Sequence, residues 1–347
     1  MKHPTVKKIN GVFEGGGVKG SALVGAIEVT EDKGYVFENV AGTSAGSLVA
    51  AFLASGYKAF EIKKIMDEVD YNKFLDQAAL ANIPVIGKGL QLFLKEGIYK
   101  GDYVEKWLAD VLAQKGVRTF GDLIMEKYSR DSTFIYKLQV IASDITNGKL
   151  LVFPNDAAEY GINPNDLSVA KALRMSISIP FFYEPVILKK FQLQRDQKSL
   201  MQLGQKVKSY IVDGGILSNF PVWLLDDNPN LDCPTLGYKL VDPAEAVPAT
   251  INGPIDFLKA MFKTMMEAHD ARYIKDSDFA RTIPIPTLGV QTTDFGITKV
   301  QKEALYQSGK DAAAKFFDTW DFAEYKKKFH NGVLTRTQKI WNKKAPN

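Results

Sequence analysis

The chain is poor in the residues on which several common protein chemistries depend. Of its 347 residues only one is cysteine, Cys233, and only three are histidine: His3, His269 and His330. A single cysteine excludes an intrachain disulfide and any metal site that needs several thiolates, which fits a reducing compartment such as the cytoplasm. We expect Cys233 to be a buried structural thiol. The usual general base of serine hydrolases is also scarce.

Long hydrophobic runs are missing as well. The longest, LVAAFLA at residues 48–54, is far shorter than the roughly 20 apolar residues that a membrane-spanning helix needs. The first residues, MKHPTVKKINGVFEGGG, contain no apolar segment followed by a small-residue cleavage site, so we expect no signal peptide. Any contact with a membrane is therefore expected to be peripheral.

The charge is close to balanced, with a formal net charge of +4. This excess is too small and too dispersed to favour a nucleic-acid partner. Residues 325–347 are the local exception, because they carry seven Lys and Arg and no Asp or Glu. This segment is either a solvated basic tail or a contact with an anionic membrane surface.

Strand-like and helix-like patterns alternate along the rest of the chain. Residues 5–13 predict a strand and 18–34 a helix, and the same order recurs in 35–42 and 43–56. Further strands are predicted at 132–144, 149–153, 209–215 and 235–243, and further helices at 101–116 (with a capping box formed by Asp102 and Glu105), 168–178 and 255–274. The alternation predicts an α/β fold with a mainly parallel central sheet and helices on both faces.

The domain organisation is expected to be simple. We expect one main domain over residues 1–290 and a C-terminal helical extension over 291–347 that packs on it and ends in the basic tail. Residues 189–208 are polar and without pattern, which indicates an insertion or a mobile hairpin. In a parallel α/β sheet, chemistry gathers at the carboxyl ends of the strands.

Three glycine-bearing turns are predicted at such strand ends: EGGGVKG at 14–20, GTSAG at 42–46 and DGG at 213–215. Alone, the G-x-G-x-x-G spacing of Gly15, Gly17 and Gly20 is also typical of a dinucleotide-binding turn. That reading lacks the acidic residue expected at the end of the second strand, and no GK[ST] follows that would make a phosphate-binding P-loop.

The GTSAG turn fits the G-x-S-x-G pattern of a nucleophilic serine. Ser44 would lie on a sharp strand-to-helix turn, which Gly42 and Gly46 permit, with its hydroxyl at the top of the sheet. The alternative is a serine N-cap in a turn of small residues.

A nucleophilic serine needs a base. His3 lies near the N-terminus and His330 in the basic tail, which leaves His269, on the apolar helix at 255–274, as the one plausible histidine of a triad. Asp213, at the end of an apolar strand and before two glycines, is the other candidate, although Asp-Gly is also a common turn. A carboxylate with a pKa near 3.9 is a weak base toward a hydroxyl, so such a pair would depend on desolvation and on oxyanion stabilisation.

The triple glycine would supply that stabilisation. Successive backbone N–H groups in a glycine-rich turn form an anion-binding nest, which the positive end of the following helix reinforces. The candidate donors are Gly15, Gly16, Gly17 and Val18. Lys19 follows in the first turn of the helix, where it is either an additional anion contact or a solvated surface lysine.

Together the three motifs resemble those of the patatin-like phospholipase family. That family is marked by G-G-G-x-[RK]-G, G-x-S-x-G and D-G-[GA] in this order, and here they stand at 15–20, 42–46 and 213–215. The resemblance covers residues 8–240. The departures are mild: Glu14 stands where aspartate is common, and Lys19 where arginine is common, which puts a bidentate role for that side chain in doubt.

The resemblance implies a three-layer α/β/α fold and a lipid acyl hydrolase, of the bacterial phospholipase A type, that needs no metal or other cofactor. Ser44 would be the nucleophile and Asp213 the general base, with a phospholipid or other acyl lipid as the substrate and a membrane surface as a transient partner. Two alternatives stay open: a Ser-His-Asp esterase that uses His269, and a non-catalytic acyl-lipid binding protein on the same fold.

Overall fold

The structure is a computed structural model, and it describes residues 7–74, 99–129, 131, 134–195, 202–226, 233–242, 251–253, 257, 260–261, 264–265, 280–292, 294 and 296–329. His3, His269 and His330 lie outside the described residues, as do the basic tail from residue 330 onward and most of the helix predicted at 255–274. The described members of that helix, residues 257, 260–261 and 264–265, are helical.

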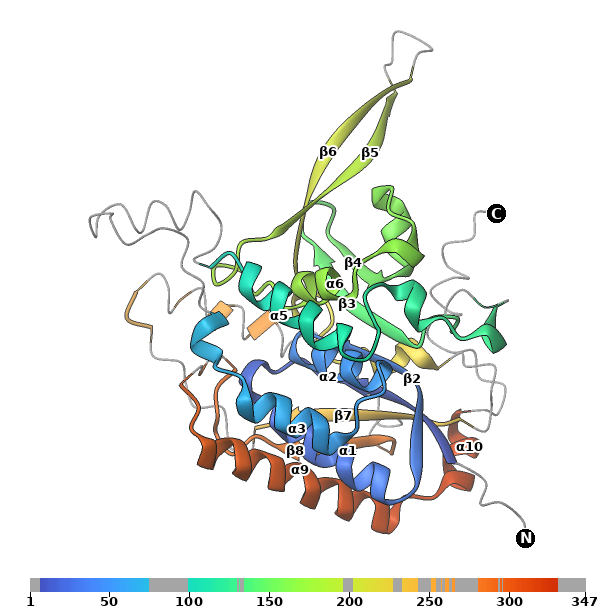
Figure 1. The fold of residues 1–347 in the computed structure, drawn as a ribbon, viewed down its shortest axis with the longest axis vertical. Helices are drawn as coiled ribbons and strands as arrows, with labels where there is room; N and C mark the ends of the chain where they lie inside the picture. The colour runs from blue at the N-terminus through green and yellow to red at the C-terminus, as the bar shows by residue number, and fades with distance from the viewer. Residues whose placement is uncertain are drawn as a thin grey trace.

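A mainly parallel sheet runs through the middle of the molecule (Figure 1). The strands follow the order β5-β6-β3-β2-β1-β7-β8, and β4 pairs with β3 outside this path. In this spatial order the pairs β3-β2, β2-β1, β1-β7 and β7-β8 are parallel. The pairs β3-β4, β3-β6 and β5-β6 are antiparallel. The predicted α/β fold with a mainly parallel central sheet is confirmed. The strands are β1 (Lys7–Phe13), β2 (Tyr35–Thr43), β3 (Leu138–Asp144), β4 (Lys149–Phe153), β5 (Val186–Arg195), β6 (Gln202–Asp213), β7 (Thr235–Val241) and β8 (Thr282–Pro286).

Alternation along the central strands divides the core between the two faces of the sheet. Ile9 and Phe13 of β1 and Val40 of β2 belong to the large cluster that packs under the helices. The helices are α1 (Gly20–Asp32), α2 (Ala45–Ala54), α3 (Ala59–Glu68), α5 (Asp102–Ala113), α6 (Val169–Ser176), α9 (Lys299–Thr319) and α10 (Phe322–Phe329). On the opposite face Val12 and Ala41 pack in a smaller cluster with Leu224 and Leu225 of the 3-10 turn η8 (Val222–Leu225).

The long helix α9 packs directly on α1 (Figure 1). A Cβ added to Gly25 of α1 would lie 1.9 Å from the carbonyl oxygen of Tyr306, and one added to Gly309 would lie 1.9 Å from the carbonyl oxygen of Ala22. The two glycines therefore let the helix backbones approach closely.

Several local predictions can be compared with the structure. The hairpin interpretation of residues 189–208 is confirmed, since β5 and β6 pair antiparallel through this segment and project beyond the helices (Figure 1). The predicted capping box at Asp102 is wrong: α5 begins at Asp102 itself, and the N-cap is Gly101 in the left-handed conformation with no side-chain cap bond. Cys233 is buried at 2% exposure, as predicted.

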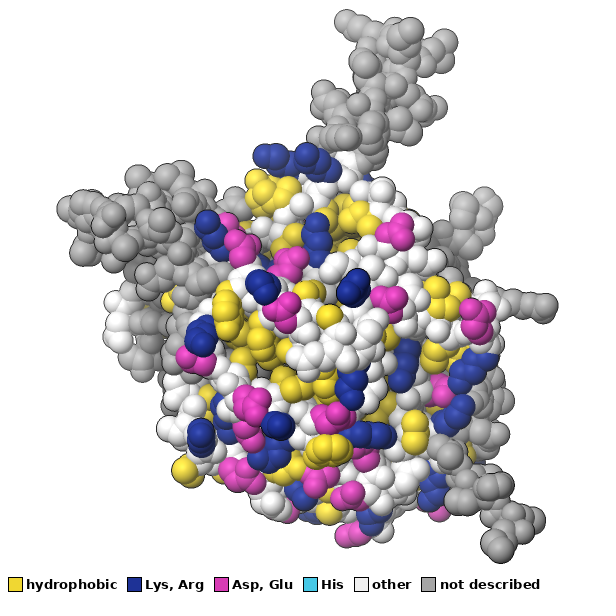
Figure 2. Space-filling view, in the orientation of Figure 1, with side chains coloured by type: hydrophobic (Ala, Val, Ile, Leu, Met, Phe, Trp, Pro, Cys, Tyr) yellow, Lys and Arg dark blue, Asp and Glu magenta, His cyan; other side chains and the backbone are white. Residues whose placement is uncertain are grey.

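The surface is mixed in charge. Figure 2 shows Lys and Arg side chains interspersed with Asp and Glu over the visible face, and apolar side chains gathered between α5 and α3. Within the part of the chain that the structure describes, no helix is both long enough and apolar enough to cross a bilayer.

Candidate active site

Ser44 occupies a sharp turn between β2 and α2. It follows Thr43, the last residue of β2, and immediately precedes Ala45, the first residue of α2. Its backbone has φ 50° and ψ −128°, a region that residues other than glycine rarely adopt. Ser44 is only 3% exposed. The structure thus places the predicted serine on a strained turn at the carboxyl edge of the sheet.

The glycines that flank Ser44 are required by close backbone approach. A Cβ on Gly42 would lie 2.5 Å from the carbonyl carbon and oxygen of Gly46. A Cβ on Gly46 would lie 2.3 Å from the carbonyl oxygen of Phe13. Because both contacts are with backbone atoms, which cannot rotate away, neither position has room for a larger residue. The G-x-S-x-G spacing therefore has a steric reason that holds whatever Ser44 does.

Asp213 reaches Ser44 because two strands share one edge of β3. Residues 138–141 of β3 pair in parallel with β2, residues 142–144 pair antiparallel with β6, and β4 occupies the other edge. The carboxyl ends of β2 and β6 therefore meet along this edge of β3, with Thr43 opposite Ile141 and Asp213 opposite Ala142. The chain thus brings together two residues 169 positions apart in sequence.

The carboxyl of Asp213 is almost without stabilising partners. Asp213 is fully buried; its Oδ1 accepts the N–H of Gly215 at 2.7 Å, while its buried Oδ2 has no well-formed hydrogen bond to a described residue. Burial raises the pKa of Asp213 to about 7, against smaller lowering effects from the Ser44 hydroxyl and the Gly215 N–H. The Ser44 hydroxyl is therefore close enough to affect the carboxyl, in a contact that is looser than a full hydrogen bond. An acid group with this pKa is able to accept a proton near neutral pH.

The glycine-rich turn at residues 14–20, called the glycine loop below, lies against the turn at Ser44. A Cβ on Gly15 would lie 3.1 Å from Cβ of Ser44, so the loop and the serine are in close contact. Two of the four predicted donors are already engaged, since the Gly15 N–H donates to the carbonyl oxygen of Asn219 and the Val18 N–H to that of Thr292, both at 3.2 Å. For the N–H groups of Gly16 and Gly17, no acceptor is found among the described residues. The structure thus narrows the candidate oxyanion donors to Gly16 and Gly17.

Three polar residues, Glu14, Asn219 and Lys239, hold the glycine loop in place, a role that the sequence did not predict for them. Glu14, 4% exposed, accepts hydrogen bonds from Lys239 Nζ at 2.8 Å and from the N–H of Leu240. Asn219 donates through Nδ2 to the carbonyl oxygen of Gly15 at 3.2 Å and to Glu14 at 3.4 Å. These bonds tie the loop to β7 and to the segment after Asp213. In the sequence the residues are single polar positions with no recurring spacing.

Ser176 is a further residue of the site that the sequence did not predict. Its hydroxyl donates to the carbonyl oxygen of Ile141 at 2.6 Å and accepts the N–H of Ser44 at 2.9 Å. It therefore bridges the point at which β2 leaves the edge of β3. The bond satisfies the backbone of the turn residue and fixes the position of Ser44.

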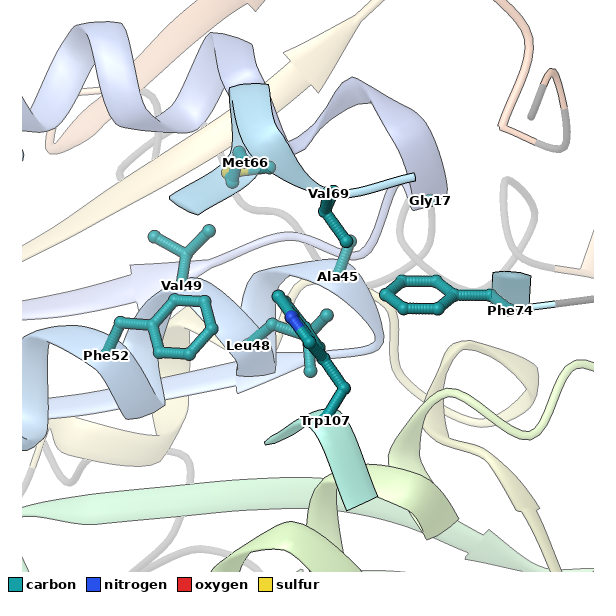
Figure 3. A pocket seen from close by; sticks show the side chains of 9 residues that line it. All are labelled: Gly17, Ala45, Leu48, Val49, Phe52, Met66, Val69, Phe74 and Trp107. Carbon is teal, nitrogen blue, oxygen red and sulfur yellow. The ribbon is translucent and has the colours of Figure 1, made fainter. Parts of the chain in front are cut away.

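An apolar pocket opens beside the serine turn (Figure 3). Its lining comes from the glycine loop, α2, α3, α5 and the segment before residue 75: Gly17, Ala45, Leu48, Val49, Phe52, Met66, Val69, Phe74 and Trp107. In Figure 3, Trp107 points from α5 toward Leu48 and Val69. The free volume in this conformation is about 30 Å³. The pocket is thus an apolar, nearly closed space that begins one residue from Ser44.

Lys19, the predicted anion contact, is half-buried at the start of α1. Its backbone N–H donates to the carbonyl oxygen of Gly16 at 3.2 Å, and its role as an anion contact stays a prediction. Within the described ranges, no group of three or more His, Cys, Asp or Glu side chains converges as a metal site would require.

Comparison with known proteins identifies relatives over most of the chain. The family described as "Patatin-like phospholipase" matches residues 11–226. The uncharacterized protein YqhO of Bacillus subtilis (strain 168) is 42% identical over 316 residues, which cover 90% of this chain and 99% of that protein. The uncharacterized protein R571 of Acanthamoeba polyphaga mimivirus is 26% identical, over 89% of this chain and 95% of that protein.

A solved structure supports the fold. The crystal structure of VipD from Legionella pneumophila superposes with a TM-score of 0.53 at 19% sequence identity, covering 91% of this chain and 67% of that one. At this identity the likeness concerns the fold.

Proposed function

The chain belongs to the patatin-like phospholipase family, and from this premise we propose that it hydrolyses fatty-acyl esters of lipids with Ser44 as nucleophile and Asp213 as general base. The observation that carries the proposal is the buried carboxyl of Asp213, which lies beside a strained serine and keeps one oxygen without a well-formed hydrogen bond. A buried acceptor without a partner is costly in a structural role. It is useful where a proton has to be taken up.

In the proposed reaction Asp213 accepts the hydroxyl proton of Ser44 while Oγ attacks the ester carbonyl. The N–H groups of Gly16 and Gly17 would donate to the oxyanion of the tetrahedral intermediate. When the intermediate collapses, the C–O bond to the alcohol breaks and the alcohol takes the proton from Asp213, which leaves an acyl-serine. Asp213 then accepts a proton from water, whose oxygen attacks the acyl-serine, and the proton returns to Ser44 as the fatty acid leaves.

The apolar pocket is suited to the acyl chain. It begins at Ala45, which follows the attacking serine, and at Gly17, which is one of the proposed oxyanion donors. A volume of about 30 Å³ holds little more than a water molecule, so a fatty chain enters only if lining side chains move apart. Met66 is unbranched and flexible, which makes such repacking inexpensive.

Two exposed apolar side chains support a membrane as the transient partner. Phe181 and Leu288 have positive φ, at 64° and 54°, although neither is a glycine. They are nevertheless 36% and 50% exposed. Phe181 lies three residues after Ser178, whose carbonyl oxygen accepts the N–H of Asp213, and Leu288 follows the carboxyl end of β8. Both residues therefore follow segments at the carboxyl edge of the sheet, which also carries Ser44. An acyl lipid would have to enter at this edge.

The test is covalent labelling of the serine combined with turnover. Wild type should react with a fluorophosphonate and hydrolyse a lipid ester, whereas Ser44→Ala should do neither and Asp213→Asn should lose turnover by several orders of magnitude. Ser55→Ala is the matched control, because Ser55 caps the other end of α2 and its hydroxyl bonds only locally to Ala51. Normal turnover in Ser44→Ala would refute the assignment.

The same experiment separates the remaining alternatives. His269→Ala should retain activity; a loss of turnover in a folded His269→Ala protein would favour the histidine triad. A folded wild type that binds acyl lipid, takes no label and hydrolyses no ester would favour the non-catalytic binding protein.

A further inference from the structure

A second cavity lies far from Ser44, between the end of α9, the start of α10 and Ala280, two residues before β8. Its volume is about 220 Å³, and Phe316, Thr319, Trp320, Asp321, Glu324 and Tyr325 line it. This is smaller than the roughly 300–1,000 Å³ of pockets that hold whole drug-sized ligands. The cavity is of a size for a head group or a small solute.

Three aromatic rings form much of the lining. The ring centroid of Trp320 is 6.1 Å from that of Phe316 and 6.3 Å from that of Tyr325. Tyr325 is held in place, since its hydroxyl accepts the N–H of Thr235, the first residue of β7. The aromatic faces carry partial negative charge, which attracts a cation that approaches within about 6 Å of the ring centroid.

Two carboxylates add full negative charge to the rings. Asp321 and Glu324 are both exposed, and neither forms an ion pair with a described residue. Oδ1 of Asp321 already accepts the N–H groups of Ala323 and Glu324, at 2.6 and 3.0 Å. The nearby guanidinium of Arg281 interacts with Tyr325 and is itself ion paired with Asp226. The cavity therefore favours a cation.

We propose that this cavity binds a quaternary ammonium group, such as the trimethylammonium end of choline or of a phosphocholine head group. A primary ammonium is strongly hydrated, and in exchange for its bound water the cavity offers only the solvent-exposed Asp321 and Glu324, the Thr319 hydroxyl and rings that have no hydrogen-bond acceptor. A trimethylated cation needs none, loses little hydration, and places its methyl groups on the ring faces while the carboxylates balance its charge.

The position of the cavity separates it from the hydrolytic site. Tyr325 contacts the amino end of β7, whereas Ser44 lies at the carboxyl end of β2, which runs in the same direction. Strands of seven residues place these two edges of the sheet on the order of 20 Å apart. A ligand in the cavity would therefore not compete with substrate at Ser44.

The test is a titration of tryptophan fluorescence with tetramethylammonium chloride, beside ammonium chloride at the same ionic strength. Tetramethylammonium should give a saturable change with an apparent Kd at least about tenfold lower than that for ammonium. The change should be lost in Trp320→Phe and kept in Trp223→Phe, because Trp223 packs on the other face of the sheet. Equal responses to the two salts, or a saturable change that survives in Trp320→Phe, would overturn the proposal.

Charge variants test the carboxylates without disturbing the rings. Glu324→Gln should weaken tetramethylammonium binding about threefold, and Asp321→Asn with Glu324→Gln about tenfold. Asp318→Asn is the control: it removes one negative charge from the same end of α9, but Asp318 does not line the cavity. Equal weakening by Asp318→Asn and Glu324→Gln would point to general electrostatics and refute a specific site.

Vesicles distinguish the two sources of the cation. Binding to phosphatidylcholine vesicles but not to phosphatidylethanolamine vesicles, with loss in the doubly substituted protein, would assign the site to a lipid head group. Saturation by free choline without such vesicle selectivity would assign it to a soluble ligand. A protein that responds to neither choline nor phosphatidylcholine would refute the proposal.

Discussion

Replacing Asp213 by Asn should make the protein more stable near neutral pH while it abolishes turnover. Asp213 has a pKa of about 7 in the folded protein, whereas an unfolded aspartate has one near 3.9. Between these values the folded state holds a proton that the unfolded state has lost, so the free energy of unfolding decreases by about 1.4 kcal/mol per pH unit as the pH rises. Above pH 7 the accumulated cost reaches about 4 kcal/mol.

The assay is urea unfolding of wild type and Asp213→Asn at several pH values from 5 to 8, followed by tryptophan fluorescence. Asparagine keeps the shape of the side chain and its Oδ1 still accepts the N–H of Gly215, but it does not titrate. The amide itself changes the free energy of unfolding by an amount that does not depend on pH. This amount drops out when the difference in unfolding free energy between the two proteins is followed from one pH to the next. We expect this difference to move in favour of Asp213→Asn by about 2–3 kcal/mol between pH 5 and 7, and then to level off.

Asp144 supplies the matched control. Its side chain is also inaccessible to solvent, although its carboxyl lies less deep in the protein, and it ends β3, next to β6. Unlike Asp213, it accepts hydrogen bonds from the Tyr160 hydroxyl and from Asn147 Nδ2, both at 2.6 Å. These and other hydrogen bonds outweigh burial and lower the pKa of Asp144. Asp144→Asn should therefore destabilise the protein, by about 2–3 kcal/mol, without a pH trend between 5 and 8, since its stabilisation is lost only as the pH falls below about 4. A flat difference for Asp213→Asn as well would refute the idea that Asp213 titrates near neutrality.

Four further outcomes are expected. The value of kcat/KM for a soluble ester should rise with pH, reach half of its maximum near pH 7 and then level off, because Asp213 has to be ionised to act as base; a half-maximum near pH 4 would contradict this. Gly16→Ala should lower kcat about 10²-fold with little change in lipid binding, since the new Cβ would lie 2.2 Å from Leu240 and displace a donor; equal losses in both would indicate a structural role. Trp107→Ala should raise the ratio of long-chain to short-chain p-nitrophenyl ester hydrolysis, and an unchanged ratio would place the acyl chain elsewhere. Leu288→Gly removes an exposed apolar side chain and relieves its positive φ, so binding to lipid vesicles should fall while Tm stays equal or rises.

The local parts of the site were predictable from sequence because short segments determine them. The turn at Ser44 depends on Gly42, whose added Cβ would meet the backbone of Gly46 within the same five-residue motif, whereas Gly46 is required by the carbonyl oxygen of Phe13 on the neighbouring strand. The strand before it and the helix after it follow from local hydrophobic periodicity. The same reasoning predicted β1 and α1 from adjacent residues alone, whereas residues 189–208 were expected to be an insertion or a mobile hairpin because they lack such a pattern.

The long-range parts were not predictable in the same way. Which glycine N–H groups are free depends on the carbonyl groups of Asn219 and Thr292, more than 200 residues further along the chain. The bridge from Ser176 to Ser44 depends on how α6 packs on β3. Single polar residues such as these show no periodicity, and only the three-dimensional register assigns them a contact.

The two buried aspartates give the strongest reason to treat Asp213 as functional. Asp144 and Asp213 end neighbouring strands in the same core, yet the chain surrounds one carboxylate with donors and leaves the other with the Gly215 N–H and a loose contact to Ser44. A purely structural aspartate gains by being satisfied as Asp144 is, or by being replaced with an apolar residue. The missing hydrogen bond at Asp213 lies beside a serine hydroxyl held on a strained turn, where a fully satisfied carboxylate would be too weak a base. The stability lost at Asp213 is thus coupled to the basicity that the proposed reaction requires.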